Sequence, residues 1–499
     1  MMKHLAYILL LGILLGSCTK NFEETNTSPN GTPTALPQQL LAPALVSTLG
    51  YNMIRNRNFN NELMQVTVDI SDSEGQVFRY DFRSTWADYL YNGLYSELTN
   101  FKDIYTTASS ELNYNPSYKG ISLICQSWIY SILTDTYGDI PYFQSNLAKD
   151  SGILEPRFDA QRDIYMDIFK KLDTANALLS AATKIDASGD PVYYGDVSKW
   201  RKFGNSLYLR LLLRVSAKSD SAVLKIKDIV ETNKANYPIM TSNSESAILR
   251  WTGLGPYVSP YLSVREQDFR SPGIASFFID NLAQWNDPRI DIPTYGSNGY
   301  NRWGIVPYSG SYQGVPSGYS PGDNPVKKCY FYSTSTVGAI TLMTEPMTGM
   351  MMNYAELQFI LAEAAAKGWI SGSAETYYNT GAQNSITQWI PTWSVPVTTW
   401  LAAADIEWLN DETLEQKMEK IHKQKYYALF LTDLQQWFEY RRTGHPYLPK
   451  GTGLRNNGVM PARMTYPVYV QSTNPTNYKL AVANQGPDLI NTLVWWQKP

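Results

Sequence analysis

The sequence predicts a mainly α-helical protein that forms a single domain carrying long irregular loops. Apolar residues recur at spacings of three and four positions along ten segments, which is the pattern of a helix with one buried face. Stretches rich in Gly, Pro, Ser and Tyr separate some of these segments, and after residue 35 none of them resembles an interdomain linker. The length of 499 residues is ample for a large core.

The expected helices follow one another along most of the chain. Segment 118–137 illustrates the pattern, since its apolar side chains would line one side of a helix. The ten segments are 36–49, 85–107, 118–137, 160–182, 198–217, 221–233, 272–282, 353–367, 374–388 and 412–442. We expect helix pairs stacked in the manner of tetratricopeptide repeats, although a repeat signature is not legible in the sequence.

Two long irregular segments, 249–271 and 291–348, lie between these helices. Loops longer than about 15 residues within a domain are usually functional or disordered. The abundance of aromatic residues argues against simple disorder. These loops are therefore the first place to expect a binding site.

The N-terminus has the layout of a lipoprotein export signal. Lys3 precedes an apolar stretch, residues 5–15, and the small pair Gly16-Ser17 stands directly before Cys18. The apolar stretch is too short to cross a membrane, which takes roughly 20 residues. We expect residues 1–17 to be removed and Cys18 to carry the lipid. Residues 18–35 read as a polar tether, leaving 36–499 as the folded domain.

Composition restricts the ligand class. A net charge of −3 argues against a nucleic-acid partner, which would require a basic surface. Aromatic residues make up 13% of the chain, led by 36 Tyr and 14 Trp. Such rings suit stacking on sugars or peptides, while a large aromatic core is the plainer explanation for most of them.

Patterns typical of catalytic sites are weak. His422 and His445 lack the spacing of a metal site and are expected to be structural. Ser320 lies in a G-x-S-x-G string, but a long loop follows it where a nucleophile elbow requires a helix. Glu356 and Glu363 share one expected helix, where capping and ion pairing explain them better than a glycosidase carboxylate pair does.

Two further patterns also favour structural explanations. The string 186–190 resembles a fragment of a calcium-binding loop, but the terminal Glu of that pattern is missing and a turn is expected. Cys125 lies in an apolar helical pattern and reads as a buried free thiol, although a disulfide with Cys329 is an alternative. We therefore predict a protein with no catalytic residue, no metal and no cofactor.

Several blocks together resemble the SusD/RagB family of outer-membrane nutrient-binding lipoproteins, in particular its SusD-like branch. They are LTDTYGDIPY at 133–142, MNYAELQFILAEAAAKGW at 352–369, IHKQKYYALFL at 421–431 and QWFEYRRTGHP at 436–446. The endings at 460–467 and 494–497 are similar to that family too. Physically these blocks look structural: Arg441 and Arg442 can fork onto carboxylates or helix ends, and Gly444 can end a helix.

The resemblance implies a helical scaffold that acts as a lid on a SusC-like, TonB-dependent outer-membrane transporter. Such proteins capture oligomeric nutrients and hand them over without cleaving them. Attachment through Cys18 would place the domain at the outer membrane, facing the exterior. The family's export tag has acidic residues soon after the cysteine, whereas Glu23 and Glu24 come late in this chain, so a periplasm-facing anchor stays open.

The resemblance also suggests three aromatic regions as ligand contacts. Sugar faces stack on such rings while Arg side chains bond hydroxyls. Trp86 fits better as a core residue at a helix start. The first region offers Phe78, Arg79 and Tyr80; the second Tyr257, Tyr261, Arg265, Phe269 and Arg270; the third Tyr300, Arg302, Trp303, Tyr308, Tyr312 and Tyr319.

Composition leaves the ligand open between an oligosaccharide and, as the RagB side of the family suggests, an oligopeptide. Two other hypotheses assign the protein to a different functional class. One is a lipid-anchored glycoside hydrolase, motivated by carboxylates near aromatic loops, and the other is a structural adhesin. Release of product from a bound glycan would identify the hydrolase. Co-purification with a large outer-membrane barrel would count against the adhesin.

Overall fold

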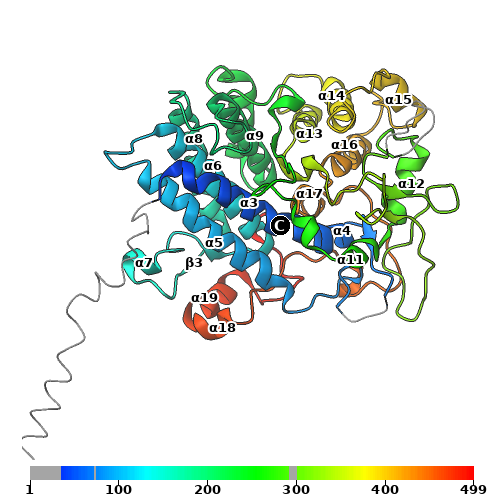
Figure 1. Ribbon diagram of the computed structural model, residues 1–499, viewed down its shortest axis with the longest axis horizontal. Helices are drawn as coiled ribbons and strands as arrows, with labels where there is room; N and C mark the ends of the chain where they lie inside the picture. The colour runs from blue at the N-terminus through cyan, green and yellow to red at the C-terminus, as the bar shows by residue number, and fades with distance from the viewer. Residues whose placement is uncertain (1–34, 72–74, 291–300) are drawn as a thin grey trace, which may run out of the picture. The chain divides into compact units, whose positions relative to one another are not determined.

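Helices build most of the protein, as the computed structural model in Figure 1 shows. The structure describes residues 35–71, 75–290 and 301–499, and residues from Pro37 to Pro499 form one compact unit. The expected fold class, mainly α, is confirmed. Cys18, the expected signal 1–17 and all but the last residue of the expected tether 18–35 lie outside the described residues.

The first half of the unit is a row of helices packed side by side. In chain order each helix packs on the next, from α3 (Pro37–Arg55) to α5 (Trp86–Thr107), α6 (Pro116–Tyr137), α8 (Gln161–Leu179) and α9 (Val197–Val215). Because α6 lies between α5 and α8, nearly its whole length is buried. This pairing of sequential helices is the expected tetratricopeptide-like arrangement.

The second half is built around α13 (Tyr354–Ala366). It packs against α14 (Ala374–Thr387) and α16 (Leu414–Ala428), and its contact with α9 joins the two halves. The side chain of Asn353 caps α13 by accepting a hydrogen bond from the backbone of Glu356, so the helix begins where the sequence pattern places it.

Shorter elements fill the connections. The remaining α-helices are α4 (Asn61–Leu63), α7 (Ala148–Ser151), α10 (Asp220–Lys227), α11 (Glu266–Arg270), α12 (Ser276–Gln284), α15 (Val397–Ala403), α17 (Gln435–Thr443), α18 (Val470–Thr473) and α19 (Pro475–Gln485). Four antiparallel strand pairs occur among the described residues: β1 (Thr67–Val68) with β5 (Gly273–Ile274), β2 (Ile140–Pro141) with β3 (Phe158–Asp159), β4 (Ala247–Leu249) with β8 (Gly349–Met352), and β6 (Ile305–Val306) with β7 (Tyr330–Phe331).

The prediction of one continuous helix over 412–442 is wrong, because the structure divides this segment into two helices, α16 and α17. Between them Leu431 and Asp433 adopt positive φ angles of 72° and 29°. An α-helix cannot pass through that backbone region. The bend turns α17 back so that Lys425 and Glu439 meet at 2.7 Å.

The helix expected over 272–282 also begins later than predicted, at Ser276. Its first residues, Gly273 and Ile274, pair with β1 instead. Helices α15 and α19 were not expected, and periodicity is weak over α19 in particular because only two of its side chains are buried.

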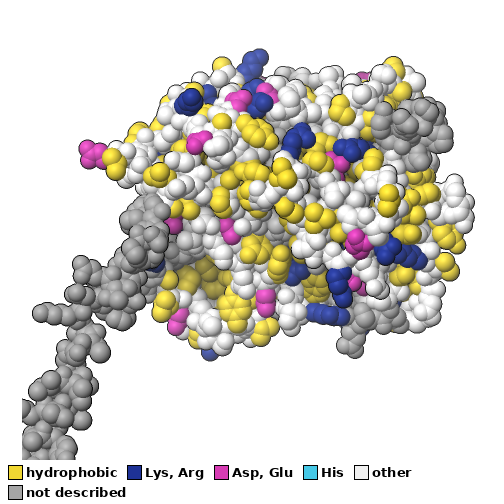
Figure 2. All heavy atoms as spheres, in the orientation of Figure 1, with side chains coloured by type: hydrophobic (Ala, Val, Ile, Leu, Met, Phe, Trp, Pro, Cys, Tyr) yellow, Lys and Arg dark blue, Asp and Glu magenta, His cyan; other side chains and the backbone are white. Residues whose placement is uncertain are grey.

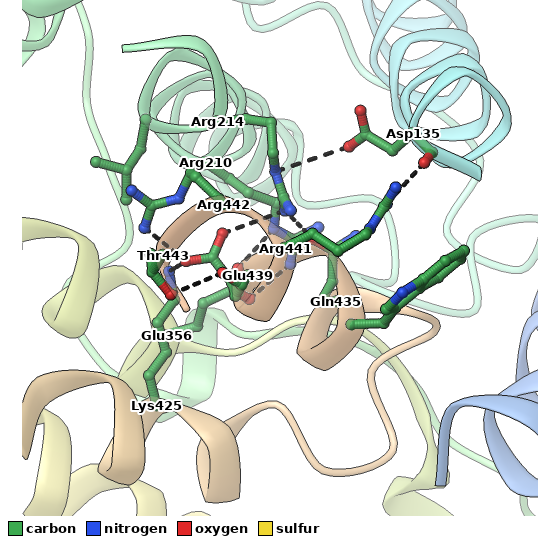
Figure 3. A network of polar contacts seen from close by, with 12 residues as sticks. Asp135, Arg210, Arg214, Glu356, Lys425, Gln435, Glu439, Arg441, Arg442 and Thr443 are labelled. Atoms are coloured by element: carbon green, nitrogen blue, oxygen red, sulfur yellow. Dashed lines mark hydrogen bonds and ion pairs between the residues drawn. The ribbon is translucent and has the colours of Figure 1, made fainter. Parts of the chain in front are cut away.

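A network of buried charges ties the two halves together (Figure 3). The guanidinium of Arg210 on α9 forks onto Glu356 of α13, with two contacts of 2.6 Å. Lys425 of α16 and Arg442 of α17 both reach Glu439, at 2.7 and 2.8 Å. The sequence blocks that carry the family resemblance therefore meet in space at one place.

Asp135 brings two more of those blocks into the network. It lies near the end of α6, and its carboxylate accepts a hydrogen bond from the indole of Trp496 at 2.8 Å. Arg441 donates to the backbone carbonyl of Asp135 at 2.7 Å. Gly444 ends α17 with a φ of 77°, as expected of a C-terminal helix cap. These contacts confirm a structural role for the charged residues of the blocks.

Candidate ligand-binding site

Half of the fourteen residues expected to contact a ligand are buried. These are Phe78, Arg79, Tyr80, Tyr261, Phe269, Trp303 and Tyr319. Trp303 has no exposed surface and packs against Phe278 and Phe430. For these residues the expectation of a surface platform is corrected, because a ring enclosed by other side chains offers no face to a ligand.

Three of the buried residues come together as a brace beneath the surface. Arg79 donates from Nε to the carbonyl of Tyr319 at 2.9 Å, and its guanidinium lies 4.5 Å from the centre of that ring. The ring of Phe78 stacks on Tyr319 at 5.0 Å. Regions far apart in the sequence thus meet, but they hold loops together and do not present rings outward.

Six of the expected residues keep some exposure: Tyr257, Arg265, Arg270, Arg302, Tyr308 and Tyr312. Arg302 is tied to Glu345 by an ion pair of 2.8 Å, and Arg265 pairs with Asp268 at 2.7 Å. Arg270 ends α11, and the other five lie in the irregular segments before α11 and after residue 300. Tyr300 lies outside the described residues.

The structure does assemble an aromatic cluster at a different place, where the C-terminal part of α3 crosses the start of α5. The rings of Tyr51 and Tyr89 meet edge to face at 5.1 Å. The guanidinium of Arg55 lies 4.7 Å from the ring of Trp86 and 4.8 Å from that of Tyr89. We call these four residues the α3–α5 aromatic cluster.

Helix geometry explains how the sequence builds this cluster. Tyr51 and Arg55 are four residues apart on α3, and Trp86 and Tyr89 are three apart on α5, so each pair shares one face of its helix. Gly93 provides the space for Tyr51, because a Cβ atom at that position would lie 2.4 Å from the ring. The glycine lets the Tyr51 ring lie directly on the backbone of α5.

The cluster combines one exposed ring, that of Tyr89, and two half-buried rings with polar groups that are only partly satisfied. Tyr89 is 38% exposed, whereas Arg55 is 7% exposed, and burial lowers the pKa of its guanidinium. Arg55 donates to Asn58 at 3.3 Å, but its Nε has no partner among the described residues. Buried polar groups without partners are uncommon and call for a reason. Sites that bind sugars commonly combine flat aromatic rings with hydrogen-bond donors.

Exposed apolar side chains lie on a loop that approaches α3 near the cluster. On one side Pro260 approaches Gly50 of α3, and Leu254, Val258 and Leu262 of the same loop are 75%, 41% and 42% exposed. On the other side the hydroxyl of Tyr469 bonds to Asn92 of α5. Figure 2 shows hydrophobic side chains gathered over the middle of the face on which α3 lies.

A comparison with known protein families shows to which family the chain belongs. A SusD-like sequence profile, described as "starch-binding associating with outer membrane", matches residues 29–467. The chain belongs to the SusD-like family. The resemblance inferred from the sequence blocks is thereby confirmed.

Solved SusD-like structures share the fold over nearly the whole chain. A SusD homologue from Bacteroides uniformis is 24% identical with a TM-score of 0.76, covering 93% of this chain and 99% of that one. A chitin-binding SusD homologue from Flavobacterium johnsoniae is 20% identical with a TM-score of 0.75, covering 93% and 98%. A SusD-like protein from Bacteroides thetaiotaomicron is 22% identical with a TM-score of 0.73, covering 92% and 98%. No curated protein matches the chain by sequence.

The weak catalytic patterns have structural explanations in this SusD-like fold. Ser320 lies in a loop and bonds to the hydroxyl of Thr452 at 2.8 Å, so no nucleophile elbow forms around it. Glu356 and Glu363 are ion-paired with arginines, as expected. Asp186 accepts bonds from Ser188 within a turn, which agrees with the expected turn.

The carboxylates of Glu363 and Glu439 and the ring of His422 lie close enough together to suggest a metal site. Arg442, however, forks onto Glu363 with contacts of 2.8 and 2.6 Å and reaches Glu439 at 2.8 Å. The guanidinium of Arg442 therefore already pairs with both carboxylates. Lys367 also pairs with Glu363 and Lys425 with Glu439, and the donor set does not fit a metal ion. His422 is buried beside Glu363, and burial lowers the pKa of its imidazole.

Two further observations concern the cysteines and the helices of the described chain. Cys125 and Cys329 are both buried and unpaired, which confirms the free thiol expected at Cys125. Within the described ranges, no helix combines the length and the apolar character needed to cross a membrane.

Proposed function

We propose that this SusD-like protein binds an oligosaccharide at the α3–α5 aromatic cluster and passes it, uncleaved, to a TonB-dependent outer-membrane transporter. The observation that carries the proposal is the arrangement of Tyr51, Tyr89 and Trp86 around Arg55. Pyranose C–H faces stack on such rings, and a guanidinium bonds sugar hydroxyls. Family membership supports the role at the outer membrane.

The chemistry of the cluster favours an extended sugar chain over a compact ligand. The rings belong to two crossing helices and are flanked by exposed apolar loop residues, so they form a surface and not an enclosed pocket. A surface of this kind suits several consecutive sugar units. The chitin-binding activity of the Flavobacterium johnsoniae homologue supports the ligand class.

Attachment to the membrane is proposed through lipid on Cys18, after removal of residues 1–17. Two or three acyl chains hold a protein firmly on a bilayer, whereas a single chain holds it only marginally. Residues 18–35 would then give the SusD-like domain the freedom to open and close above a transporter. Metabolic labelling with a palmitate analogue, with Cys18→Ala as the unlabelled control, tests this attachment.

A glycan and peptide array of soluble protein that starts at residue 35 tests the binding role. We expect binding to one class of glycan and about tenfold weaker binding in Tyr89→Ala, since an aromatic stacking partner is lost. Tyr114→Ala removes a ring that is 60% exposed on a different part of the surface and serves as the matched control. Binding to peptides alone would replace the proposal with the oligopeptide alternative.

The absence of catalysis is tested with the same preparation. Incubation with any glycan that binds should return the glycan unchanged in length by mass spectrometry. Shortened product that disappears in a carboxylate variant would establish the hydrolase alternative and contradict a binding-only role.

A further inference from the structure

A small pocket beside α11 carries two positive charges and no acidic lining. It has a volume of about 290 Å³ and is lined by Ile70, Gln267, Arg270, Ser271, Lys327 and Tyr330. None of these described lining residues is acidic. The pocket adjoins the buried cluster that contains Phe78 and Tyr319, because Ile70 packs against that cluster.

Arg270 lines this pocket and has no carboxylate within ion-pair distance among the described residues. Its side chain makes no ion pair or hydrogen bond with the described residues, and its Nε is buried without a partner. The two carboxylates on α11 bond to other residues, and Glu266 interacts with Arg270 only at longer range, where the cation contributes to lowering the pKa of Glu266. Glu266 bonds to the hydroxyls of Ser333 and Thr334, and Asp268 pairs with Arg265.

Lys327 brings the second charge to the same pocket. Its ammonium group donates to the backbone carbonyl of Arg270 and lies 4.1 Å from the centre of the Tyr330 ring. Burial and the nearby Arg270 lower the pKa of Lys327. Two cations that repel each other in a partly desolvated pocket are stabilised when an anion lies between them.

We infer that this pocket binds the carboxylate or sulfate group of an acidic oligosaccharide. The inference rests on the proposed function, because it assigns a charged substituent to the sugar bound by this protein. Guanidinium and ammonium groups hold a planar carboxylate or a sulfate through charge-assisted hydrogen bonds. Gln267 and Ser271 supply neutral groups for adjacent hydroxyls.

The size of the pocket limits what it accepts. Ligand pockets usually span roughly 300–1,000 Å³, so this one is at the lower end. It accommodates one substituted sugar unit and not a whole oligomer. The expected ligand is therefore a glycan that carries a uronate or sulfate group, which Arg270 and Lys327 would bind.

The test compares small probes of the two anion types with a neutral analogue. Saturation-transfer NMR with glucuronate, glucose 6-sulfate and glucose is carried out on the soluble protein that starts at residue 35. We expect transfer to one or both anionic probes and none to glucose, with the signal falling as ionic strength rises. Glucuronate alone would indicate a uronate, and glucose 6-sulfate alone would indicate a sulfated sugar.

Charge-matched variants locate the binding. Arg270→Gln and Lys327→Gln should each weaken binding of the anionic probe about tenfold, which corresponds to the loss of one charge-assisted hydrogen bond. Arg162→Gln and Lys328→Gln remove the same charges from residues that do not line the pocket, and should leave binding unchanged. Equal loss in the control variants would show a general charge effect and would overturn the inference.

The outcomes for this pocket and for the aromatic cluster are distinguishable. If anionic and neutral probes give equal signals and Arg270→Gln does not change them, the inference about this pocket is wrong. That result does not affect the proposed binding of an oligosaccharide at the aromatic cluster. An anionic probe that binds at Arg270 while no oligosaccharide on the array binds would overturn the proposed function and support the anion site. A response to acidic peptides alone, lost in Lys327→Gln, would replace the sugar with a peptide.

Discussion

The guanidinium of Arg55 on α3 lies 4.7 Å from the ring of Trp86 on α5 and links the two helices that form the aromatic cluster. The same group lies 4.8 Å from Tyr89, so one cation contacts two rings. A planar guanidinium stacks on rings where a lysine ammonium does not. This contact therefore ties the geometry of the ligand surface to the packing of the scaffold.

Arg55→Lys should weaken glycan binding while the protein remains folded. The ammonium keeps the charge but lacks the flat face that holds Trp86 and Tyr89 in place. We expect about a tenfold loss of affinity by isothermal titration, corresponding to about 1.4 kcal/mol. Arg162→Lys, on the exposed side of α8, is the control. Equal affinity for Arg55→Lys and the native protein would remove Arg55 from the site.

Gly93→Ala should disturb the cluster through a single methyl group. The new Cβ would lie 2.4 Å from the ring of Tyr51, so the ring must move away from α5. Overpacking of this kind costs about 1–3 kcal/mol of unfolding free energy. Chemical denaturation measures that loss, and glycan titration should show weaker binding.

Gly50→Ala is the matched control for that substitution. Gly50 also lies inside a helix of this pair, but its nearest neighbour would be 3.8 Å from the added Cβ, an ordinary contact. Alanine in a helix is more favourable than glycine by roughly 0.5–1 kcal/mol, so this variant should be stabilised. If both alanine variants changed stability in the same direction, the close approach of Tyr51 to α5 would not explain Gly93.

Arg442→Gln should destabilise the protein strongly, because Glu363 and Glu439 would remain buried with less compensation. Contacts from Arg442 to both carboxylates hold the pKa of Glu363 well below its usual range. Removing one partner of a buried ion pair costs about 3–5 kcal/mol. Thermal or urea unfolding measures the loss. Arg265→Gln, which breaks an exposed pair with Asp268, should change stability by at most about 1 kcal/mol.

Glu62→Gln should stabilise the protein more at pH 8 than at pH 5. Burial, together with the nearby Asp69, raises the pKa of Glu62 to about 8. Between its ordinary pKa near 4.5 and about 8, the folded state retains a proton that the unfolded chain has released, so native stability falls as pH rises. The glutamine variant lacks this dependence. A stability difference that is the same at both pH values in urea titrations would contradict the assignment.

The helices and the structural role of the charged blocks could be predicted from the sequence. Periodicity located α3, α5, α6, α8, α9, α13 and α14, because each buries a continuous face. The ion-paired roles of Glu356 and Glu363 followed from their place on one helix face. The break between α16 and α17 could not be predicted, since it depends on the left-handed backbone of Leu431 and Asp433 within an apolar run.

The ligand surface was harder to predict, because composition shows that rings are present but does not show how deep they lie. Loop aromatics such as Trp303 and Tyr261 fold back into the core, whereas Tyr89 emerges from a regular helix. Trp86 was expected at a helix start, and the structure places it there, half-buried and in contact with Arg55. The pairing of Tyr51 with Tyr89 required the crossing of α3 and α5, which no local pattern reveals.

A crystal structure of the protein with the best-binding glycan from the array tests the central claim most directly. The account predicts sugar density lying against the rings of Tyr51 and Tyr89, with a hydroxyl within hydrogen-bond distance of Arg55. Sugar density on another face, with the α3–α5 aromatic cluster unoccupied at saturating glycan, would contradict it.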